Sequence, residues 1–243
     1  MKLPLFFISD IHLRLTVSDD ESVKRKHLID FVNHVVDEQG TLFIVGDLFD
    51  FWFEYKYVIP HAYFDILTTF RQAKLSGVDI FFIPGNHDFW TRSFSREIIF
   101  SEIHAEGISF EESDRKFLII HGDGLLSWDY GYRAFRKIIR SRLFTWLYRW
   151  IHPDIGYAIG RWISRTGRHP IHTKEYNDRV IADLSEYTAD QFKNEVDYII
   201  MGHYHQVKKI KIDSGTLVIL GDWLTHRSFG YFDGKEFSLN YWR

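Results

Sequence analysis

Seven side chains with metal-binding atoms follow directly after short apolar runs of the sequence. They are Asp10, His12, Asp47, Asn86, His121, His203 and His205. The chain has no cysteine, so thiolate sites and disulfides are excluded, and imidazole and oxygen ligands suit Mn²⁺, Fe or Zn²⁺. The set is too large for one ion of ordinary coordination but suits two divalent ions that share a carboxylate. Two ions roughly 3.5–4 Å apart can clamp a phosphoryl group and activate water, which predicts hydrolysis of a phosphate ester or phosphoanhydride.

The spacing within the motifs gives further expectations. Asp10 and His12 are two residues apart, so in an extended segment both side chains lie on one face and reach one metal ion. His203 and His205 have the same spacing and either share an ion or diverge to two ions. A glycine stands before Asp47, before Asn86 and before His203, where it permits tight turns and close backbone approach.

The elements that position these residues are expected to be buried strands. The apolar runs cover residues 5–8, 41–45, 78–83, 117–120, 198–201 and 216–220. Helical spacing at 21–38 and 61–76 separates the first strands, which predicts an α/β core with the following loops in one crevice. Residues 207–212, 216–220, 229–232 and 237–242 are separated by turn residues and predict antiparallel hairpins. Together, these strands and helices predict a mixed-sheet sandwich flanked by helices.

Residues 125–191 interrupt the strand rhythm and predict a helical insertion. Apolar residues from 135 to 150 recur at the spacing of one amphipathic helix, and further helices are expected at 155–164 and 173–192. Between residues 125 and 170 there are nine Arg or Lys against two acids. An apolar stripe and a basic face suit an acyl-binding cap that contacts an anionic membrane. The alternatives are an apolar stripe packed on the core and a solvated basic face.

Length and composition fit a core of residues 1–124 and 192–243 with residues 125–191 inserted as the cap. No apolar stretch approaches the roughly 20 residues that span a bilayer, and the N-terminal apolar run is too short for a signal peptide. We therefore expect a cytoplasmic protein, either free or attached peripherally to the inner membrane. The net charge of −3 is unremarkable. No nucleic-acid partner is expected, and the oligomeric state stays open.

In order along the chain, the motifs resemble the signature of the calcineurin-like metallophosphoesterases. They are Asp10-x-His12, Gly46-Asp47, Gly85-Asn86-His87-Asp88, His121 and Gly202-His203-x-His205. The resemblance implies a four-layer α-β-β-α sandwich of two mixed sheets. It also implies one ion on Asp10, His12, Asp47 and His205, and a second on Asp47, Asn86, His121 and His203, with Mn²⁺ expected ahead of Fe or Zn²⁺. His87 would protonate the leaving group or stabilise phosphoryl charge, with Asp50 as its orienting partner.

The flanks of these motifs are similar to the UDP-2,3-diacylglucosamine pyrophosphohydrolase family of lipid A biosynthesis. The similar segments are residues 7–13, 46–52, 121–124 and 129–136. The resemblance implies a phosphorylated glycolipid or nucleotide substrate, an apolar cap for acyl chains, and Asp129, Tyr132 and Arg133 at the border of the substrate. The best-known members of that family have Arg at the position of His87, so the chain resembles a related branch whose substrate need not be identical.

Two other functions remain as hypotheses. One is a phosphodiesterase or nucleotide phosphatase of the same superfamily with another substrate. The other is a non-enzymatic scaffold, which typically loses metal ligands, whereas none is missing here. Asp123 is expected to orient the His121 loop, and Gly221-Asp222-Trp223 is expected to be a turn that packs Trp223 near the site. The following histidines match no motif and are expected at the surface or in structural roles: His27, His34, His61, His104, His152, His169 and His172.

Overall fold

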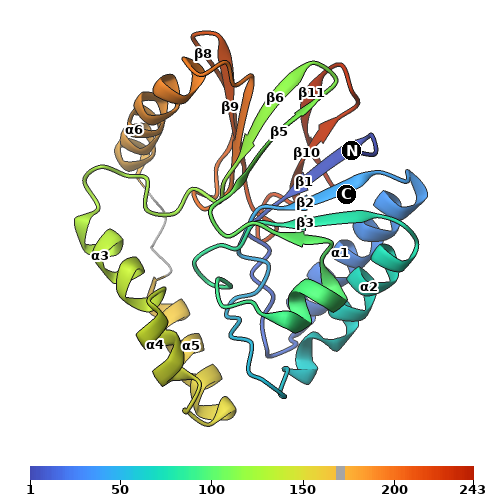
Figure 1. The fold of residues 1–243 in the computed structure, drawn as a ribbon, viewed down its shortest axis with the longest axis vertical. Helices are drawn as coiled ribbons and strands as arrows, with labels where there is room; N and C mark the ends of the chain where they lie inside the picture. The colour runs from blue at the N-terminus through green and yellow to red at the C-terminus, as the bar shows by residue number, and fades with distance from the viewer. Residues whose placement is uncertain (168–172) are drawn as a thin grey trace.

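Two mixed β-sheets lie face to face in the computed structural model, which describes residues 1–167 and 173–243 (Figure 1). The first sheet has the order β11-β10-β1-β2-β3-β4. Strands β1 to β4 are parallel, β10 is antiparallel to β1, and β11 is antiparallel to β10. Its strands are β1 (Leu5–Ile8), β2 (Thr41–Ile44), β3 (Asp79–Phe82), β4 (Glu102–Ile103), β10 (Ser228–Phe232) and β11 (Phe237–Tyr241).

The second sheet has the order β5-β6-β7-β9-β8. Strands β6, β7 and β9 are parallel, whereas β5 and β8 pair antiparallel at the two edges. Its strands are β5 (Ile108–Glu112), β6 (Arg115–Ile119), β7 (Tyr198–Met201), β8 (Val207–Ile212) and β9 (Gly215–Leu220). The predicted hairpins at the C-terminal end are confirmed as the pairs β8–β9 and β10–β11.

Alternation along the buried strands divides the core into layers. In β1, Phe6 and Ile8 join the cluster beneath α1 (Asp19–Asp37) and α2 (Phe64–Leu75), whereas Leu5 and Phe7 join the cluster between the sheets. Successive strand side chains point to opposite faces, so fully apolar strands serve two cores at once.

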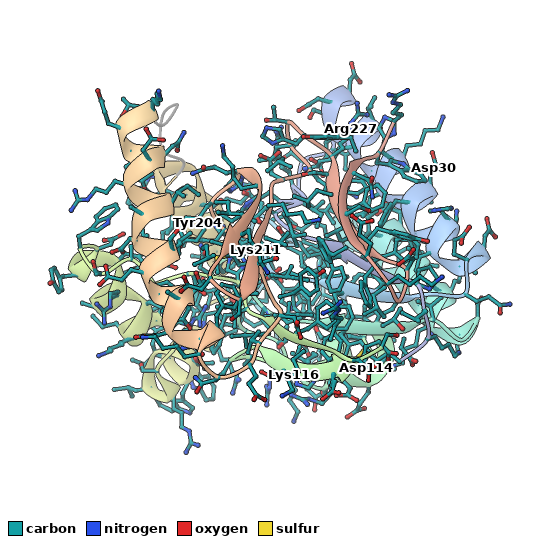
Figure 2. The ribbon with its side chains drawn as sticks, turned by 90° about the horizontal axis from the view of Figure 1, so that it is seen from above. Asp30, Asp114, Lys116, Tyr204, Lys211 and Arg227 are labelled. Atoms are coloured by element: carbon teal, nitrogen blue, oxygen red, sulfur yellow. The ribbon has the colours of Figure 1, made fainter. Side chains whose placement is uncertain are left out.

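The second sheet repeats this division with its own helix. Ile200 of β7 joins the cluster between the sheets, and Ile199 and Met201 pack beneath α6 (Lys174–Phe192) with Leu184. Seen from above, α6, the two sheets and α1 follow one another (Figure 2). These layers confirm the predicted α-β-β-α sandwich of two mixed sheets.

Three helices project from one end of the sandwich: α3 (Tyr130–Ile139), α4 (Arg142–Tyr148) and α5 (Pro153–Gly167) (Figure 1). The single helix expected over residues 135–150 is wrong, because α3 ends at Ile139 and α4 begins at Arg142. The Ser141 hydroxyl accepts a hydrogen bond from the Phe144 amide at 3.2 Å and so caps a new helix. We propose that residues 125–191 form the insertion, of which α3, α4 and α5 project while α6 supplies the outer layer.

Helix α5 packs closely on the chain that follows β2. The ring of Tyr157 joins a cluster with Phe51 and Phe53, and its hydroxyl donates to the Phe53 carbonyl oxygen at 2.8 Å. Gly160 makes this approach possible, because a Cβ atom there would collide with the Phe51 ring. Helix α5 is therefore in contact with a loop that leads from the Asp47 motif.

The sequence reading missed β4 and β5. Strand β4 has two residues, which is too short for a periodic signal. Strand β5 has no fully buried residue and pairs with β6 across Ser113 and Asp114, which both adopt positive φ. Two shorter elements complete the described fold, a 3₁₀ turn at His61–Tyr63 and a π-helical turn at Ser95–Ile99.

Candidate metal centre

Loops from both sheets meet at one edge of the sandwich. Asp10 follows β1, Asp47 follows β2 and Asn86 follows β3 in the first sheet, whereas the three remaining histidines, His121, His203 and His205, follow β6 and β7 in the second. Backbone hydrogen bonds from the Asp10 amide to Gly46 O (3.1 Å) and from the His12 amide to Asp47 O (2.9 Å) hold the first two loops together. The site therefore spans the two sheets.

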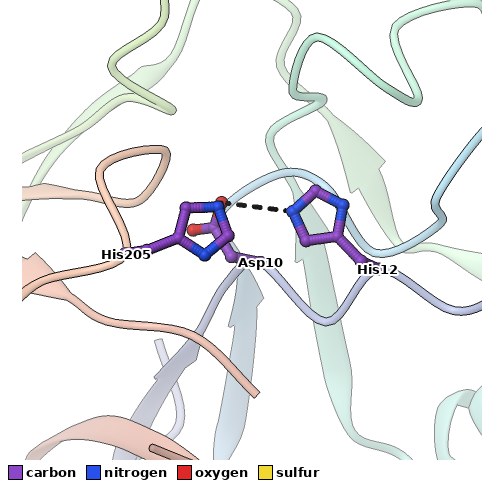
Figure 3. Close-up of side chains that lie close together, drawn as sticks. All are labelled: Asp10, His12 and His205. Carbon is purple, nitrogen blue, oxygen red and sulfur yellow. Dashed lines mark ion pairs between the residues drawn. The ribbon is translucent and has the colours of Figure 1, made fainter. Parts of the chain in front are cut away.

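Asp10, His12 and His205 form one group of possible metal ligands (Figure 3). The Asp10 Oδ1 atom lies 3.8 Å from His12 Nε2 and 3.5 Å from His205 Nε2. The other oxygen, Oδ2, accepts hydrogen bonds from the Ser9 hydroxyl at 2.5 Å and from the His203 amide at 2.8 Å. Asp10 is thus held by one oxygen, while its other oxygen faces two imidazoles.

Asp47 belongs to two further groups, one with His12 and His87 and one with His121 and His203. Its Oδ2 atom lies 3.4 Å from His121 Nε2, 3.8 Å from His12 Nε2 and 3.9 Å from His87 Nε2. The structure therefore places one Asp47 oxygen between histidines of both groups. Its Oδ1 atom accepts a hydrogen bond from the His87 amide at 2.9 Å.

Asn86 lies beside the second group, with its Oδ1 atom 3.3 Å from His121 Nε2. His203 and His205 diverge, since His203 is grouped with Asp47 and His205 with Asp10. The two imidazoles therefore lie in different groups of possible ligands, and whether they bind two ions stays a prediction.

The expected extended geometry of Asp10-x-His12 is wrong. Strand β1 ends at Ile8, and Asp10 and His12 have φ values of 53° and 47°. Asp47, His203 and His205 share this left-handed conformation, with φ between 53° and 68°. Residues other than glycine rarely adopt this backbone region, and those that do concentrate at functional sites, where the surrounding structure maintains the strained conformation. Tight loops, and not strand pleating, bring these side chains together.

The donor atoms of this centre fit divalent cations. His12 is 5% exposed, and neither of its ring nitrogens has a hydrogen-bond partner among the described residues, nor has Asp10 Oδ1. Buried polar atoms are normally paired, so orphans of this kind need an explanation. Two buried carboxylates among four imidazoles, with no sulfur, suit borderline transition metals.

The pKa values of the four imidazoles separate into two pairs in the protein without metal. Burial lowers the pKa of His12 well below its usual value, and burial with the nearby charge of His121 lowers that of His203 to about 3. Burial also acts to lower the pKa of His121 and His205, but nearby carboxylates outweigh it and raise these values to about 10 and about 9. The two carboxylates thus favour the protonated forms of His121 and His205 when no cation is bound.

The orientation of His121 is set by the residue that follows β2. Its Nδ1 atom lies 2.9 Å from the Val45 carbonyl oxygen, which turns Nε2 toward Asp47. Gly46 has a φ of +82°, and a Cβ atom there would collide with the His121 ring. The glycine before Asp47 is therefore required both by its backbone conformation and by the ring beside it.

Asp88 ties two ligand loops together, a role that the sequence reading did not assign. Its buried carboxylate accepts from the amides of Leu48 at 2.7 Å and Gly85 at 2.8 Å, and more weakly from those of Asp47 and Phe49. Burial, with the charge of Asp47, raises the pKa of Asp88 to about 7. The signal was its place in the Gly-Asn-His-Asp motif after a buried strand.

His87 lies at the mouth of the centre with its side chain 20% exposed. Its Nδ1 atom lies 2.8 Å from the main-chain carbonyl oxygen of Asp50, so the contact with Asp50 runs through the backbone. The Asp50 carboxylate accepts a hydrogen bond from the Ser164 hydroxyl of α5 at 2.7 Å. Asp50 therefore links the cap helix to His87.

The three predicted substrate residues lie at the start of α3. The Asp129 carboxylate caps this helix by accepting from the Tyr132 amide at 3.1 Å, and Arg133 is exposed. The Tyr132 ring lies 6.0 Å from that of His203, and its hydroxyl donates to Asp123. Tyr132 therefore lies beside a candidate metal ligand.

Asp123 joins α3 to the loop after β6. Its Oδ2 atom accepts from Arg136 Nε at 2.6 Å and from Arg140 Nη2 at 2.8 Å. Arg140 Nη2 also lies 3.3 Å from the carbonyl oxygen of Gly85, in the loop that carries Asn86. The expected role of Asp123, orienting the loop of His121, stays a prediction, and these contacts support it.

The histidines without a motif stay outside the metal-ligand groups in the described part of the chain. They pair elsewhere, for example His27 with Arg227 at 2.6 Å and His104 with Glu102 at 2.8 Å, or pack as His34 does against Phe6. His169 and His172 lie outside the described residues.

The sequence profile of the calcineurin-like phosphoesterases matches residues 3–207. The chain belongs to this family, and the match together with the clustered His and Asp side chains defines a metal-dependent phosphoesterase.

Similar proteins cover nearly the whole chain. It is 30% identical to UDP-2,3-diacylglucosamine hydrolase of Porphyromonas gingivalis, over 98% of this chain and 97% of that protein. It is 28% identical to UDP-2,3-diacylglucosamine hydrolase of Vibrio cholerae, over 98% of this chain and 97% of that protein. A solved archaeal phosphodiesterase aligns with a TM-score of 0.46 and 18% identity, over 98% of this chain and 99% of that chain.

Proposed function

We propose that this protein hydrolyses the pyrophosphate of UDP-2,3-diacylglucosamine to UMP and 2,3-diacylglucosamine 1-phosphate in lipid A biosynthesis. The observation that carries the proposal is the position of the candidate metal centre beside helices with exposed apolar and basic side chains. The names of the full-length relatives support this substrate.

The ligand assignment is part of the proposal. Asp10, His12 and His205 would hold one cation, and Asn86, His121 and His203 the other, with Asp47 shared. The location of Asp47 Oδ2 between His12 and His121 supports the shared position. We expect Mn²⁺, with Fe or Zn²⁺ as alternatives, because all three accept such ligands. Bound in this way, two divalent ions supply charge neutralisation at the phosphoryl oxygens and lower the pKa of a water molecule.

His87 is proposed to protonate the leaving group or stabilise phosphoryl charge. With Nδ1 on the Asp50 carbonyl oxygen, its Nε2 atom faces the centre, 3.9 Å from Asp47 Oδ2. A proton held at Nε2 would therefore be within reach of a phosphoryl group beside Asp47. Asp50 would act as the residue that orients this ring.

Helices α3 to α5 are proposed to accommodate the acyl chains and contact an anionic membrane. Ile138, Trp146, Trp150 and Trp162 are 54–77% exposed, so packing on the core does not account for them. Exposed basic residues stand among them, including Arg133, Lys137 and Arg142. No helix in the described ranges is long and apolar enough to cross a membrane. We propose a cytoplasmic protein that attaches peripherally to the membrane. Each basic residue near an anionic membrane surface contributes about 1 kcal/mol to binding.

The substrate proposal is tested by incubating the Mn²⁺-loaded protein with UDP-2,3-diacylglucosamine in detergent micelles and following the products by ³¹P NMR. Release of UMP and a sugar 1-phosphate is expected. Asp129, Tyr132 and Arg133 are proposed to border this substrate, so replacing Tyr132 by Phe should raise KM. No turnover of this substrate, with hydrolysis of simpler nucleotides, would refute the substrate and leave the phosphoesterase chemistry.

A phosphodiesterase or nucleotide phosphatase with another substrate is the second candidate. His87 favours this candidate, because the best-known members of the UDP-2,3-diacylglucosamine pyrophosphohydrolase family have Arg at that position. Mass spectrometry of lipids extracted from the purified protein separates the candidates, because a co-purified acylated glycolipid supports the first and is not expected for the second.

A further inference from the structure

The turn after β9 packs against the candidate metal centre on two sides. Trp223 is 1% exposed and stacks edge-on against Phe31, as expected for a residue that packs near the site. Its amide donates to the Asp10 carbonyl oxygen at 3.1 Å, so the turn contacts the Asp10 loop directly. The preceding residue, Asp222, is 3% exposed and faces His205.

The two oxygens of Asp222 have different partners. Oδ1 accepts from the backbone amides of Thr225 at 2.6 Å and His226 at 3.3 Å, and so closes the turn. Oδ2 faces two imidazoles, His226 Nδ1 at 3.0 Å and His205 Nδ1 at 3.5 Å. One oxygen therefore serves the backbone, and the other serves side chains.

The two ring nitrogens of His205 are divided in the same way. Nε2 lies 3.5 Å from Asp10 Oδ1, and the ring is stacked on that of His12 with centroids 5.3 Å apart (Figure 3). Nδ1 points instead toward Asp222. A histidine that binds a metal ion through one nitrogen usually donates its other N–H to a carboxylate or carbonyl, which fixes the tautomer and the ring orientation.

We propose that Asp222 is a positioning residue that holds the proton of His205 on Nδ1 and so leaves the Nε2 lone pair directed at Asp10 for a divalent transition-metal cation. The inference rests on the proposed two-cation centre. It assigns a task to a residue of the second sheet's last loop that touches neither the substrate nor the reacting atoms.

Replacement of Asp222 by Asn separates this task from closing the turn. The amides of Thr225 and His226 require an acceptor, so the remaining carbonyl oxygen takes the place of Oδ1 and the new NH₂ group takes that of Oδ2. The NH₂ group then donates to His205 Nδ1, which favours the tautomer with the proton on Nε2. That tautomer has no lone pair directed at Asp10. The turn is preserved, but His205 Nε2 can no longer bind a cation.

The experiment compares wild type, Asp222→Asn and His226→Phe for Mn²⁺ content, Mn²⁺ affinity by chelator competition, and electron paramagnetic resonance. The Phe variant removes the other imidazole on Oδ2 and is the matched control. We expect wild type and control to hold two coupled ions. Asp222→Asn should lose one ion, with affinity at that position about 10–100-fold weaker, and give the spectrum of an isolated ion. The melting temperature of its metal-free form should equal that of wild type.

Two results would overturn the inference: retention of both ions with wild-type affinity in Asp222→Asn, or loss of both ions together with a lower melting temperature of the metal-free form. The second result would mean that Asp222 only closes the turn. Wild type with fewer than two ions would overturn the metal assignment and this inference together. Wild type with two ions but no phosphoester turnover would overturn the proposed activity alone.

Discussion

The Nδ1 atom of His87 lies 2.8 Å from the main-chain carbonyl oxygen of Asp50. The Asp50 carboxylate accepts a hydrogen bond from Ser164 of α5, 114 residues further along the chain, so the residue that contacts His87 also contacts this helix. A main-chain acceptor also means that the partner of His87 survives a change of the Asp50 side chain.

Replacement of His87 by Ala should lower kcat by about 100-fold or more, because a positioned proton donor typically contributes 10²–10⁴-fold. Metal content should stay at the wild-type value, since His87 is not among the proposed ligands. Turnover and elemental analysis of the same sample check both parts. Loss of metal in this variant would contradict the role assigned to His87.

Replacement of Asp47 by Ala should nearly abolish turnover and reduce the bound metal, because the shared ligand of both cations is removed. Elemental analysis and steady-state kinetics measure the two effects. Asp30→Asn is the control, since Asp30 is exposed on α1 (Figure 2). Full metal content in Asp47→Ala would refute the shared position.

Replacement of Gly160 by Val should displace α5 from the chain after β2, because the new side chain would occupy the place of the Phe51 ring. Overpacking of this kind costs about 1–3 kcal/mol. The melting temperature and kcat/KM should fall while the metal content is retained. Gly131→Val on α3 is the matched control, since a Cβ atom there meets nothing within 4 Å. Equal behaviour of the two variants would exclude a role for this helix contact.

The affinity for metal should rise with pH up to about 10. Burial lowers the pKa of His205, but Asp10, Asp222 and Asp47 outweigh it and raise the value to about 9 from 6.5. Below pH 9 a cation must displace this proton, and below about pH 10 also that of His121, so affinity gains roughly tenfold per pH unit for each proton released and levels above about pH 10. In the metal-free protein, the stability that comes from protonated His205 is complete below pH 6.5 and disappears as pH rises through 9.

Calorimetry of Mn²⁺ binding in buffers of different ionisation enthalpy counts the protons released. Release of at least one proton at pH 7 is expected. Binding with no proton release at pH 7 and an affinity independent of pH would show that His205 is neutral before the cation arrives.

The strands and most ligands were predictable because the sequence carries their signals directly. Runs such as residues 5–8 are apolar on both faces, since Phe6 and Phe7 pack in different cores. The candidate ligands stand at the ends of these runs. The break between α3 and α4 was not predictable from apolar spacing, because the spacing continues past Ser141, whose hydroxyl caps the start of a new helix.

The parts of the site that sequence could not supply are three-dimensional choices. Nothing in the Asp10-x-His12 spacing reveals left-handed backbone at both positions, and nothing in His203-x-His205 decides whether the rings share an ion. Gly-Asp after a strand is common, so Asp222 could be recognised only when His205 was seen beside it.

Each proposed group of ligands draws residues from both sheets: Asp10 and His12 meet His205, and Asp47 meets His121 and His203. Cations bound there would connect the two sheets, so the sheets could not separate without releasing the cations. The free energy of binding would then oppose unfolding in proportion to the logarithm of the free metal concentration. Resistance of this chain to proteolysis would follow the supply of metal as closely as its turnover does.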